Sequence, residues 1–243
     1  MAVVLFTDFG PTDLYVGQVE LAIELVQPGL RVVHLLHEAP TYNILASAHL
    51  LDALIARLPR GQVVVAVVDP GVGGPRRGCV LQAGGTCLIG PDNGLLSITA
   101  QRYGAYQAWH LPPADAGHAA TFHGRDVFGP AAAHIAAGRG DMLGLIPADE
   151  LDVRLSHADL SQIVYVDHYG NAFTGLRARF VSPEAVIEVG GLALTRARCF
   201  SDCQPGEAFW YENSIGLVEI AIAQGHAASA LGLAVGHPVP VRG

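Results

Sequence analysis

GQVVVAVVDPGVGGPRRG, residues 61–78, joins an uninterrupted apolar run to a loop of glycines, prolines and paired arginines. The run from Gln62 to Val68 is rich in β-branched residues and lacks the alternation of a half-exposed strand. It therefore predicts a strand buried on both faces, which is typical of parallel sheets covered by helices. Asp69 follows directly, so a carboxylate lies at the carboxyl end of the predicted strand.

The chain before this strand contains two strand–helix pairs. Apolar runs at 2–6 and 31–36 predict strands, and helical spacing follows them at 14–26 and 43–58. Two consecutive βαβ units imply a parallel sheet, whose strands end at one rim. We expect three loops to share that rim, namely Thr7–Asp13, His37–Tyr42 and Asp69–Arg77.

The chain beyond Pro70 turns to shorter elements. Strand patterns at 79–83 and 86–89, a PDNG turn at 91–94 and a helix from Arg125 to about Gly138 still belong to the first domain. Later apolar runs are short and mostly non-helical, at 163–167, 185–189, 209–211 and 217–223, with one late helix at 226–233. The pattern predicts an α/β protein, with a mostly parallel-sheet α/β domain at residues 1–154 and a smaller antiparallel domain, a barrel or sandwich, at 155–243.

Composition limits the possible partners. The 243 residues are 51% hydrophobic and 15% charged, which is sufficient for a large core. The net charge of −8 provides no basic footprint for nucleic acid. No uninterrupted apolar stretch approaches a membrane-spanning length, and the start of the chain lacks a signal-peptide pattern. We therefore expect a cytoplasmic protein without a membrane partner. The four cysteines form no CxxC pair; we expect reduced thiols and assign no metal.

Two carboxylates of the predicted rim are candidates for chemistry. Asp8 suits a ribose diol, although a plain loop or cap aspartate fits its position equally well. Asp69 is followed by Gly71 and Gly73, which allow close backbone approach, and by Arg76 and Arg77, which can hold a carboxylate ionised. The segment matches neither the Walker nor the Rossmann phosphate pattern, and a turn in which Asp and Arg merely pair is the alternative.

Three further segments carry polar groups. His123 lies in FHGRD just before a helix, where an imidazole can move protons or orient a carboxylate. In the second domain, Asp167 and Asn171 follow one strand, and a polar turn containing Ser214 lies between two others. These groups suit an amino acid's ammonium and carboxylate, although either segment could be an ordinary hairpin connection.

Six ordered motifs together resemble one known family, the SAM hydroxide adenosyltransferases, which are S-adenosylmethionine hydrolases related to the fluorinase and chlorinase. The motifs are TDFGPTDLYVG, VVDPGVGGPRR, PDNG, FHGRDVFGPAAAH, DHYGN and ENSIGLVEIA. The resemblance implies an α/β N-terminal domain, a β-rich C-terminal domain and a homotrimer with substrate held between subunits. It implies S-adenosyl-L-methionine as substrate, adenosine and L-methionine as products, and no metal or organic cofactor.

The resemblance also implies roles for individual residues. Asp69, Arg76 and His123 would form a catalytic trio that handles water. Substrate-binding residues would include Asp8 on the ribose hydroxyls and Phe122, together with Asp167, Asn171, Ser214 and, as a weaker candidate, Glu219, for the methionine and adenine portions. Halogenases have a tyrosine-containing stretch in place of Asp69-Pro70-Gly71 and usually arginine in place of Ile215, so both departures favour water over halide as the nucleophile.

Three alternatives stay open at this level. A 5′-halogenase would use the same substrate, and a fixed anion at Asp69 argues against it by repelling halide. A non-catalytic adenosine or S-adenosylmethionine sensor would need Asp8 and Asn171 but not the trio. A metallohydrolase would gather Asp8, Asp69, Asp92 and His123 around a divalent ion.

Overall fold

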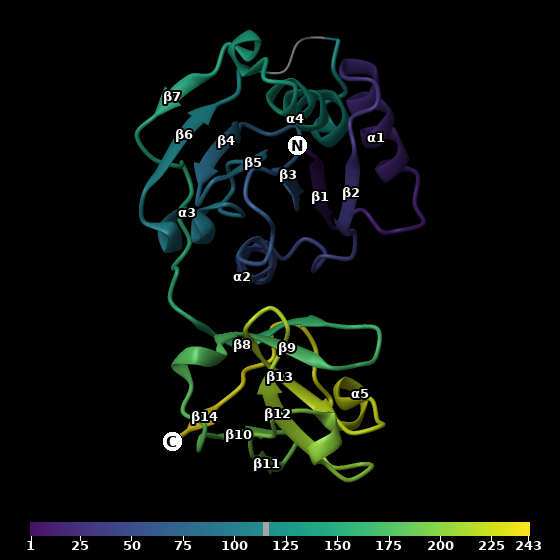
Figure 1. Ribbon diagram of the computed structural model, residues 1–243, viewed down its shortest axis with the longest axis vertical. Helices are drawn as coiled ribbons and strands as arrows, with labels where there is room; N and C mark the ends of the chain where they lie inside the picture. The colour runs from purple at the N-terminus through teal and green to yellow at the C-terminus, as the bar shows by residue number, and fades with distance from the viewer. Residues whose placement is uncertain (114–116) are drawn as a thin grey trace. The chain divides into compact units, whose positions relative to one another are not determined.

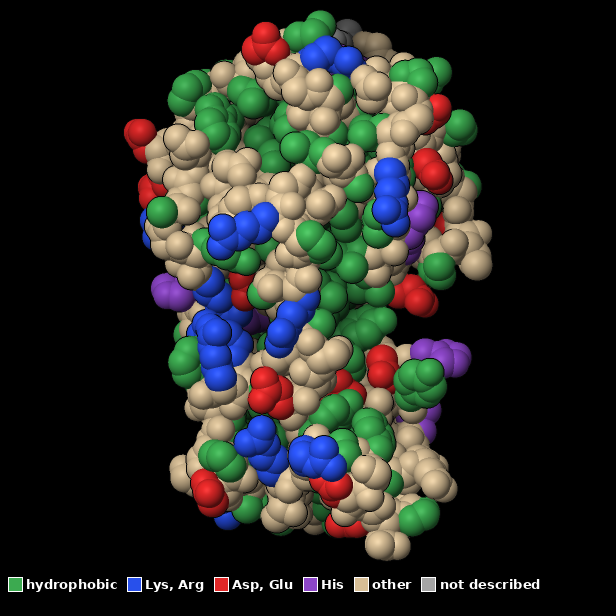
Figure 2. All heavy atoms as spheres, viewed as in Figure 1, with side chains coloured by type: hydrophobic (Ala, Val, Ile, Leu, Met, Phe, Trp, Pro, Cys, Tyr) green, Lys and Arg blue, Asp and Glu red, His purple; other side chains and the backbone are tan. Residues whose placement is uncertain are grey.

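The computed structural model describes residues 1–113 and 117–243, which form two compact units, Met1–His157 and Ala158–Gly243. Each unit is described by itself (Figure 1). No helix among the described residues is both long and apolar enough to cross a membrane. The four cysteines are free thiols, as expected. Acidic and basic side chains both occur on the face shown in Figure 2, in keeping with the modest net charge.

The first unit is built on a seven-stranded sheet with the order β2-β1-β3-β5-β4-β6-β7. Its strands are β1 (Val3–Thr7), β2 (Val32–Leu36), β3 (Val63–Val67), β4 (Gly78–Ala83), β5 (Thr86–Pro91), β6 (Tyr106–His110) and β7 (Ile146–Ala148). The pairs β1–β2, β1–β3 and β3–β5 are parallel, which confirms the predicted parallel sheet. The strands β4, β6 and β7 extend it in antiparallel fashion. All residues of β1 and β3 are buried, because helices cover both faces of these central strands.

Helices of the first unit connect and cover the strands. They are α1 (Tyr15–Val26), α2 (Ile44–Ile55), α3 (Ser97–Tyr103) and α4 (Gly129–Ala136), with a π-helical turn at Gly124–Phe128 and a 3₁₀ turn at Gly140–Leu143. The helices α1 and α4 pack against each other, as Figure 1 shows, and α4 also contacts β1 and β3. Val19 and Ile23 of α1 share one buried cluster with Phe128 and with Val63, Val65 and Val67 of β3. The π-helical turn before α4 lies close to the carboxyl end of β3, since Gly124 lines one cavity with Val67 and Asp69.

The second unit contains two antiparallel sheets. One has the order β12-β13-β9-β8 and the other β11-β10-β14. The elements are β8 (Leu160–Val166), β9 (Ala172–Arg177), β10 (Val186–Val189), β11 (Leu192–Leu194), β12 (Ala208–Glu212), β13 (Leu217–Ile222), α5 (Ala227–Leu231) and β14 (Val241–Arg242), with 3₁₀ turns at Ala178–Phe180 and Phe200–Asp202. Side chains from both sheets, including Trp210 and Ile187, meet in one buried cluster.

The expected antiparallel second domain is confirmed, and of the two forms considered for it a closed barrel is ruled out, because the two sheets stay separate. The segment before β14 runs along the free edge of β8, where Val239 N donates to Ser161 O at 2.9 Å, but only a single bridge joins Gln162 to Pro238. Prolines at 238 and 240 have no N–H to donate, so a continuous ladder cannot form along this edge.

Candidate active site

Asp69 and Arg76 form a buried ion pair within the loop that follows β3. The Nε of Arg76 donates to both oxygens of Asp69, at 2.9 Å to Oδ2 and 3.2 Å to Oδ1, and a second guanidinium nitrogen also donates to Oδ2. The Asp69 side chain is 4% exposed and that of Arg76 is 12% exposed. The Arg76 guanidinium lies over the ring of Phe128, with Cζ 5.4 Å from the ring centroid. The carboxylate therefore has a fixed orientation and a compensating charge.

His123 joins this pair through the same guanidinium. A terminal nitrogen of Arg76 lies 2.8 Å from Nδ1 of His123, at the residue that caps the π-helical turn. Because a guanidinium only donates, Nδ1 must accept, and the hydrogen of the neutral ring is carried by Nε2. Burial, and then the charge of Arg76, lower the pKa of His123 below its ordinary value. The structure thus brings the three predicted catalytic residues together as a carboxylate, a guanidinium and a neutral imidazole.

Gly73 shapes the loop between Asp69 and Arg76. Its φ of +79° lies in the left-handed region, and a Cβ built there would be 2.5 Å from the carbonyl oxygen of Ala120. Only glycine fits this close approach between two backbone segments. The contact joins the loop after β3 to the segment that carries His123.

A cavity of about 390 Å³ opens beside Asp69 and His123. Its walls comprise Asp8, Phe9, Asp13, Tyr15, Thr41, Tyr42, Val67, Asp69, Val72, Thr121, Phe122, His123 and Gly124. Each of the three loops predicted to share one rim contributes residues to these walls, which confirms that expectation. The rings of Phe9, Tyr15 and Phe122 pack edge to face or tilted, with centroids 5.3–5.8 Å apart, and form an aromatic wall.

Asp8 lies in this cavity at the carboxyl end of β1. The backbone N–H of Tyr42 donates to its Oδ2 at 3.1 Å. Burial, partly offset by that hydrogen bond, raises the pKa of Asp8. Tyr42 holds a positive φ of 58°, which is unusual for a residue other than glycine and aims its N–H at the carboxylate.

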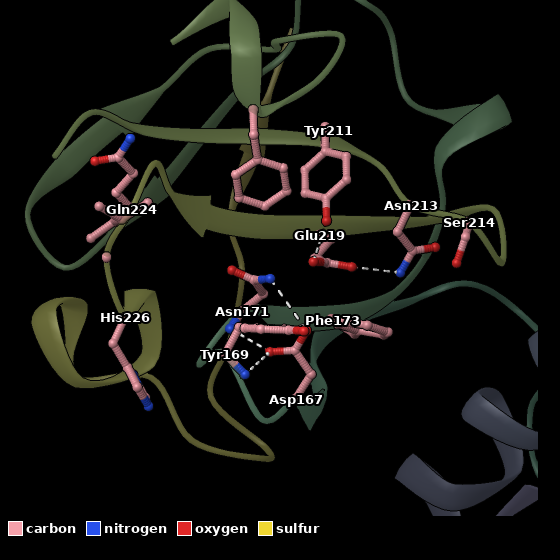
Figure 3. Close-up of a pocket in the computed structure, with 13 residues that line it drawn as sticks. Asp167, Tyr169, Asn171, Phe173, Tyr211, Asn213, Ser214, Glu219, Gln224 and His226 are labelled. Carbon is pink, nitrogen blue, oxygen red and sulfur yellow. Dashed lines mark hydrogen bonds between the residues drawn. The ribbon is translucent and has the colours of Figure 1, made fainter. Parts of the chain in front are cut away.

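A second cavity, of about 880 Å³, lies in the second unit. It is lined by four of the predicted substrate-binding residues, Asp167, Asn171, Ser214 and Glu219, as Figure 3 shows. Asp167 Oδ1 accepts the backbone N–H of Asn171 at 2.8 Å, and Asn171 Nδ2 donates to Asp167 Oδ2 at 3.2 Å. Asp167 and Asn171 are therefore hydrogen-bonded to each other at the cavity wall.

Glu219 is the buried carboxylate of the second cavity. Asn213 Nδ2 donates to its Oε2 at 2.9 Å, and the hydroxyl of Tyr211 donates to Oε1. Figure 3 shows both side chains pointing to Glu219. Burial is the largest cause that raises the pKa of Glu219, and it also raises the pKa of Tyr211. Aromatic rings of Phe173, Phe200 and Tyr211 complete walls that suit a flat or partly apolar ligand.

The residues proposed for a metallohydrolase do not gather at one place. Asp8, Asp69 and His123 line the first cavity, whereas the buried Asp92 side chain accepts from His110 Nε2 at 3.1 Å. Across residues 1–113 and 117–243, the one group with metal-ligand spacing is Asp92, His110 and Asp152. Asp152 in that group is ion-paired with Arg77, so a guanidinium already provides its counter-charge.

Several cavity residues were not singled out from the sequence. Phe9, Thr41 and Tyr42 lie in the predicted rim loops 7–13 and 37–42, which the rim argument identifies without their side chains, and Tyr15 begins α1 just beyond the first of these loops. Asn213 belongs to the ENSIGLVEIA motif and Tyr211 immediately precedes it; the motif alone gives neither residue a role. Phe9 and Asn213 lie within two positions of a strand end, which is the signal that could have identified them, whereas Tyr211 lies inside β12 and carries no such signal.

Comparisons with known proteins give one consistent result. Models of the SAM hydroxide adenosyltransferase N-terminal and C-terminal domains match residues 3–144 and 161–240. An (R)-S-adenosyl-L-methionine hydrolase from Thermus thermophilus is 37% identical over 98% of this chain and 98% of its own length. The hydrolase of the same name from Salinispora arenicola is 36% identical over 97% of this chain. A crystal structure of an uncharacterized conserved protein from Thermotoga maritima covers 98% of this chain and 99% of its own, with a TM-score of 0.88 and 26% identity.

Proposed function

This chain belongs to the SAM hydroxide adenosyltransferase family, and from that premise we propose that it hydrolyses S-adenosyl-L-methionine at its first cavity. The products are adenosine and L-methionine. The observation that carries the mechanism is the hydrogen-bonded series Asp69, Arg76 and His123 at the wall of a 390 Å³ cavity. This series offers a fixed anion to a water molecule where a ribose can also bind.

The reaction is an in-line displacement at the 5′ carbon. A bond forms between the water oxygen and C5′ while the C5′–sulfur bond breaks, and its electron pair goes to sulfur. Methionine leaves with a neutral thioether, so no general acid is needed at the leaving group. The enzyme has to make the water more like hydroxide and to align it with the breaking bond.

Asp69 is the base in this mechanism. Arg76 binds Oδ2 more closely than Oδ1, which leaves Oδ1 as the oxygen to accept the water proton. Positioned proton transfer of this kind contributes about 10²- to 10⁴-fold in rate. His123 cannot accept at Nδ1, where Arg76 already donates, so the neutral ring positions the guanidinium and presents an Nε2–H donor.

Binding of the substrate uses both units in this proposal. Asp8 accepts hydrogen bonds from the ribose hydroxyls, and Phe122 contributes to the aromatic wall of the first cavity. Asp167, Asn171, Ser214 and Glu219 hold the methionine and adenine portions. We propose a homotrimer with substrate held between subunits, for which light scattering should give three times the chain mass of 25.5 kDa.

Oxygen-18 labelling tests the reaction. Hydrolysis in H₂¹⁸O should give adenosine carrying one ¹⁸O at its 5′ position and methionine without label. Unlabelled adenosine would reject attack of water on C5′. Matched reactions with added chloride or fluoride test the halogenase alternative, because a 5′-halo-adenosine in the mass spectrum would replace the hydrolytic conclusion.

A further inference from the structure

The PDNG turn, residues 91–94 at the end of β5, is hydrogen-bonded to the loop that carries Asp69 and Arg76. Asn93 Nδ2 donates to the backbone carbonyl of Val68 at 2.9 Å, a contact between residues 25 apart in the sequence. Val68 is fully buried and immediately precedes Asp69. Asn93 therefore fixes the peptide from which the Asp69 side chain projects.

The same turn holds the other end of the loop. The backbone N–H of Asp92 donates to the carbonyl of Arg77 at 2.9 Å, and Arg77 immediately follows Arg76. Two neighbouring residues of one turn thus bind the two ends of the 69–76 segment. The loop that contains the Asp69–Arg76 ion pair is therefore hydrogen-bonded at both of its ends to this turn.

Buried groups keep the turn itself in place. The Asp92 side chain is 1% exposed and accepts from His110 Nε2 at 3.1 Å. Its Oδ2 also accepts the backbone N–H of Asp152 at 2.9 Å. The side-chain oxygen of Asn93 accepts the N–H of Leu95 at 3.2 Å, which closes the turn locally. The Asn93 side chain therefore uses its oxygen to accept a hydrogen bond within its own turn and its amide nitrogen to donate one to the catalytic loop.

We propose that Asn93 is a positioning residue for hydrolysis, which holds the Val68 carbonyl so that Asp69 faces Arg76 and the attacking water. This inference rests on the proposed function of Asp69. Asn93 is not among the described residues that line the 390 Å³ cavity, so it acts on the carboxylate and not on the substrate. A shift of about 1 Å in a catalytic group can cost about 100-fold in rate.

Asn93→Asp is the most direct variant. It keeps the oxygen that accepts from Leu95 and replaces the amide donor by an acceptor that faces the Val68 carbonyl. Gln101→Glu is the matched control, because Gln101 Nε2 also donates to backbone carbonyls, those of Ser97 and Leu155, at 2.9 and 2.8 Å. Both positions are half-buried, and only the first touches the catalytic loop.

Steady-state kinetics and hydrogen exchange provide the readouts. Asn93→Asp should lower kcat about 10- to 100-fold with KM for S-adenosylmethionine unchanged, and should speed amide exchange only in residues 69–77. Gln101→Glu should leave kcat and exchange in that loop unchanged. An Asn93→Asp enzyme with wild-type kcat, or one whose KM rises in proportion to its loss of activity, would overturn the proposal.

Two further variants separate the possible failures. Asn93→Ser keeps a small turn-forming oxygen and loses the reach to Val68, so it should reproduce the kinetic effect if Asn93→Asp does not fold. If both variants unfold, Asn93 is a folding determinant and the positioning role is rejected. Active Asp69→Asn enzyme would reject the function proposed for Asp69, whereas inactive Asp69→Asn beside fully active Asn93→Asp would reject only the role of Asn93.

Discussion

Replacement of Arg76 by methionine should leave an uncompensated carboxylate in a buried place. The Asp69 side chain is 4% exposed and Arg76 supplies its ion pair. Removing one partner of a buried pair costs about 3–5 kcal/mol of unfolding free energy. For a chain of this size each kcal/mol lowers the melting temperature by about 2–4 °C, so a decrease of about 6–20 °C is expected. Hydrolysis should also be lost, because the base is no longer oriented.

The double variant Asp69→Asn/Arg76→Met is the decisive comparison. It removes both charges, so most of the lost stability should return while the enzyme stays inactive. Arg154→Met is the control, because Arg154 pairs with Glu150 at an exposed position, where such a pair contributes about 0–1 kcal/mol. Thermal unfolding and adenosine release measure the two effects. A double variant no more stable than Arg76→Met would refute the buried-charge explanation.

Three more predictions follow from the same geometry. Burial and Arg76 lower the pKa of His123, so the imidazole should stay neutral down to a pH below about 6.5. The pH profile of kcat should therefore fall on the acid side only below that value. A fall in kcat that begins above pH of about 6.5 would contradict the hydrogen bond assigned to Nδ1. Gly73→Ala should lower the melting temperature and slow hydrolysis, because the new Cβ would lie 2.5 Å from the Ala120 carbonyl oxygen. Gly17→Ala in α1 is the control, since a Cβ added there meets no other atom within 4 Å. It should leave the rate unchanged and the melting temperature unchanged or slightly raised. Exhaustive dialysis against EDTA should leave the rate unchanged, since no step needs a Lewis acid; a loss restored by a divalent cation would revive the metallohydrolase.

The central strands β1 and β3 of the parallel half could be predicted because they are almost entirely apolar. Val63–Val67 and Val3–Thr7 are buried on both faces, and that environment leaves a direct trace in composition. The helix α3 left no such trace. Its seven residues include the buried polar side chains Ser97 and Thr99, and tertiary packing rather than apolar spacing holds them in a helix. Closure of the second unit also depends on which strand edges meet, which alternation alone does not specify.

The site could be predicted where local sequence controls its geometry. Asp69 and Arg76 lie seven residues apart in one loop, so their pairing could be inferred from spacing and charge. The contact of Arg76 with His123 spans 47 residues and depends on how the π-helical turn packs, although the shared rim made it plausible. The bond from Asn93 to Val68 could not be inferred, because an asparagine before glycine reads equally well as an ordinary turn.

Single-turnover hydrolysis by Asp69→Asn tests the mechanism most directly. Asparagine keeps the size of the side chain and loses the charge and the base. With enzyme in excess over S-adenosylmethionine, and with substrate affinity measured separately by calorimetry, the variant should bind the substrate as the wild type does. It should release adenosine about 10²- to 10⁴-fold more slowly. Release at the wild-type rate with unchanged affinity would show that another group activates the water.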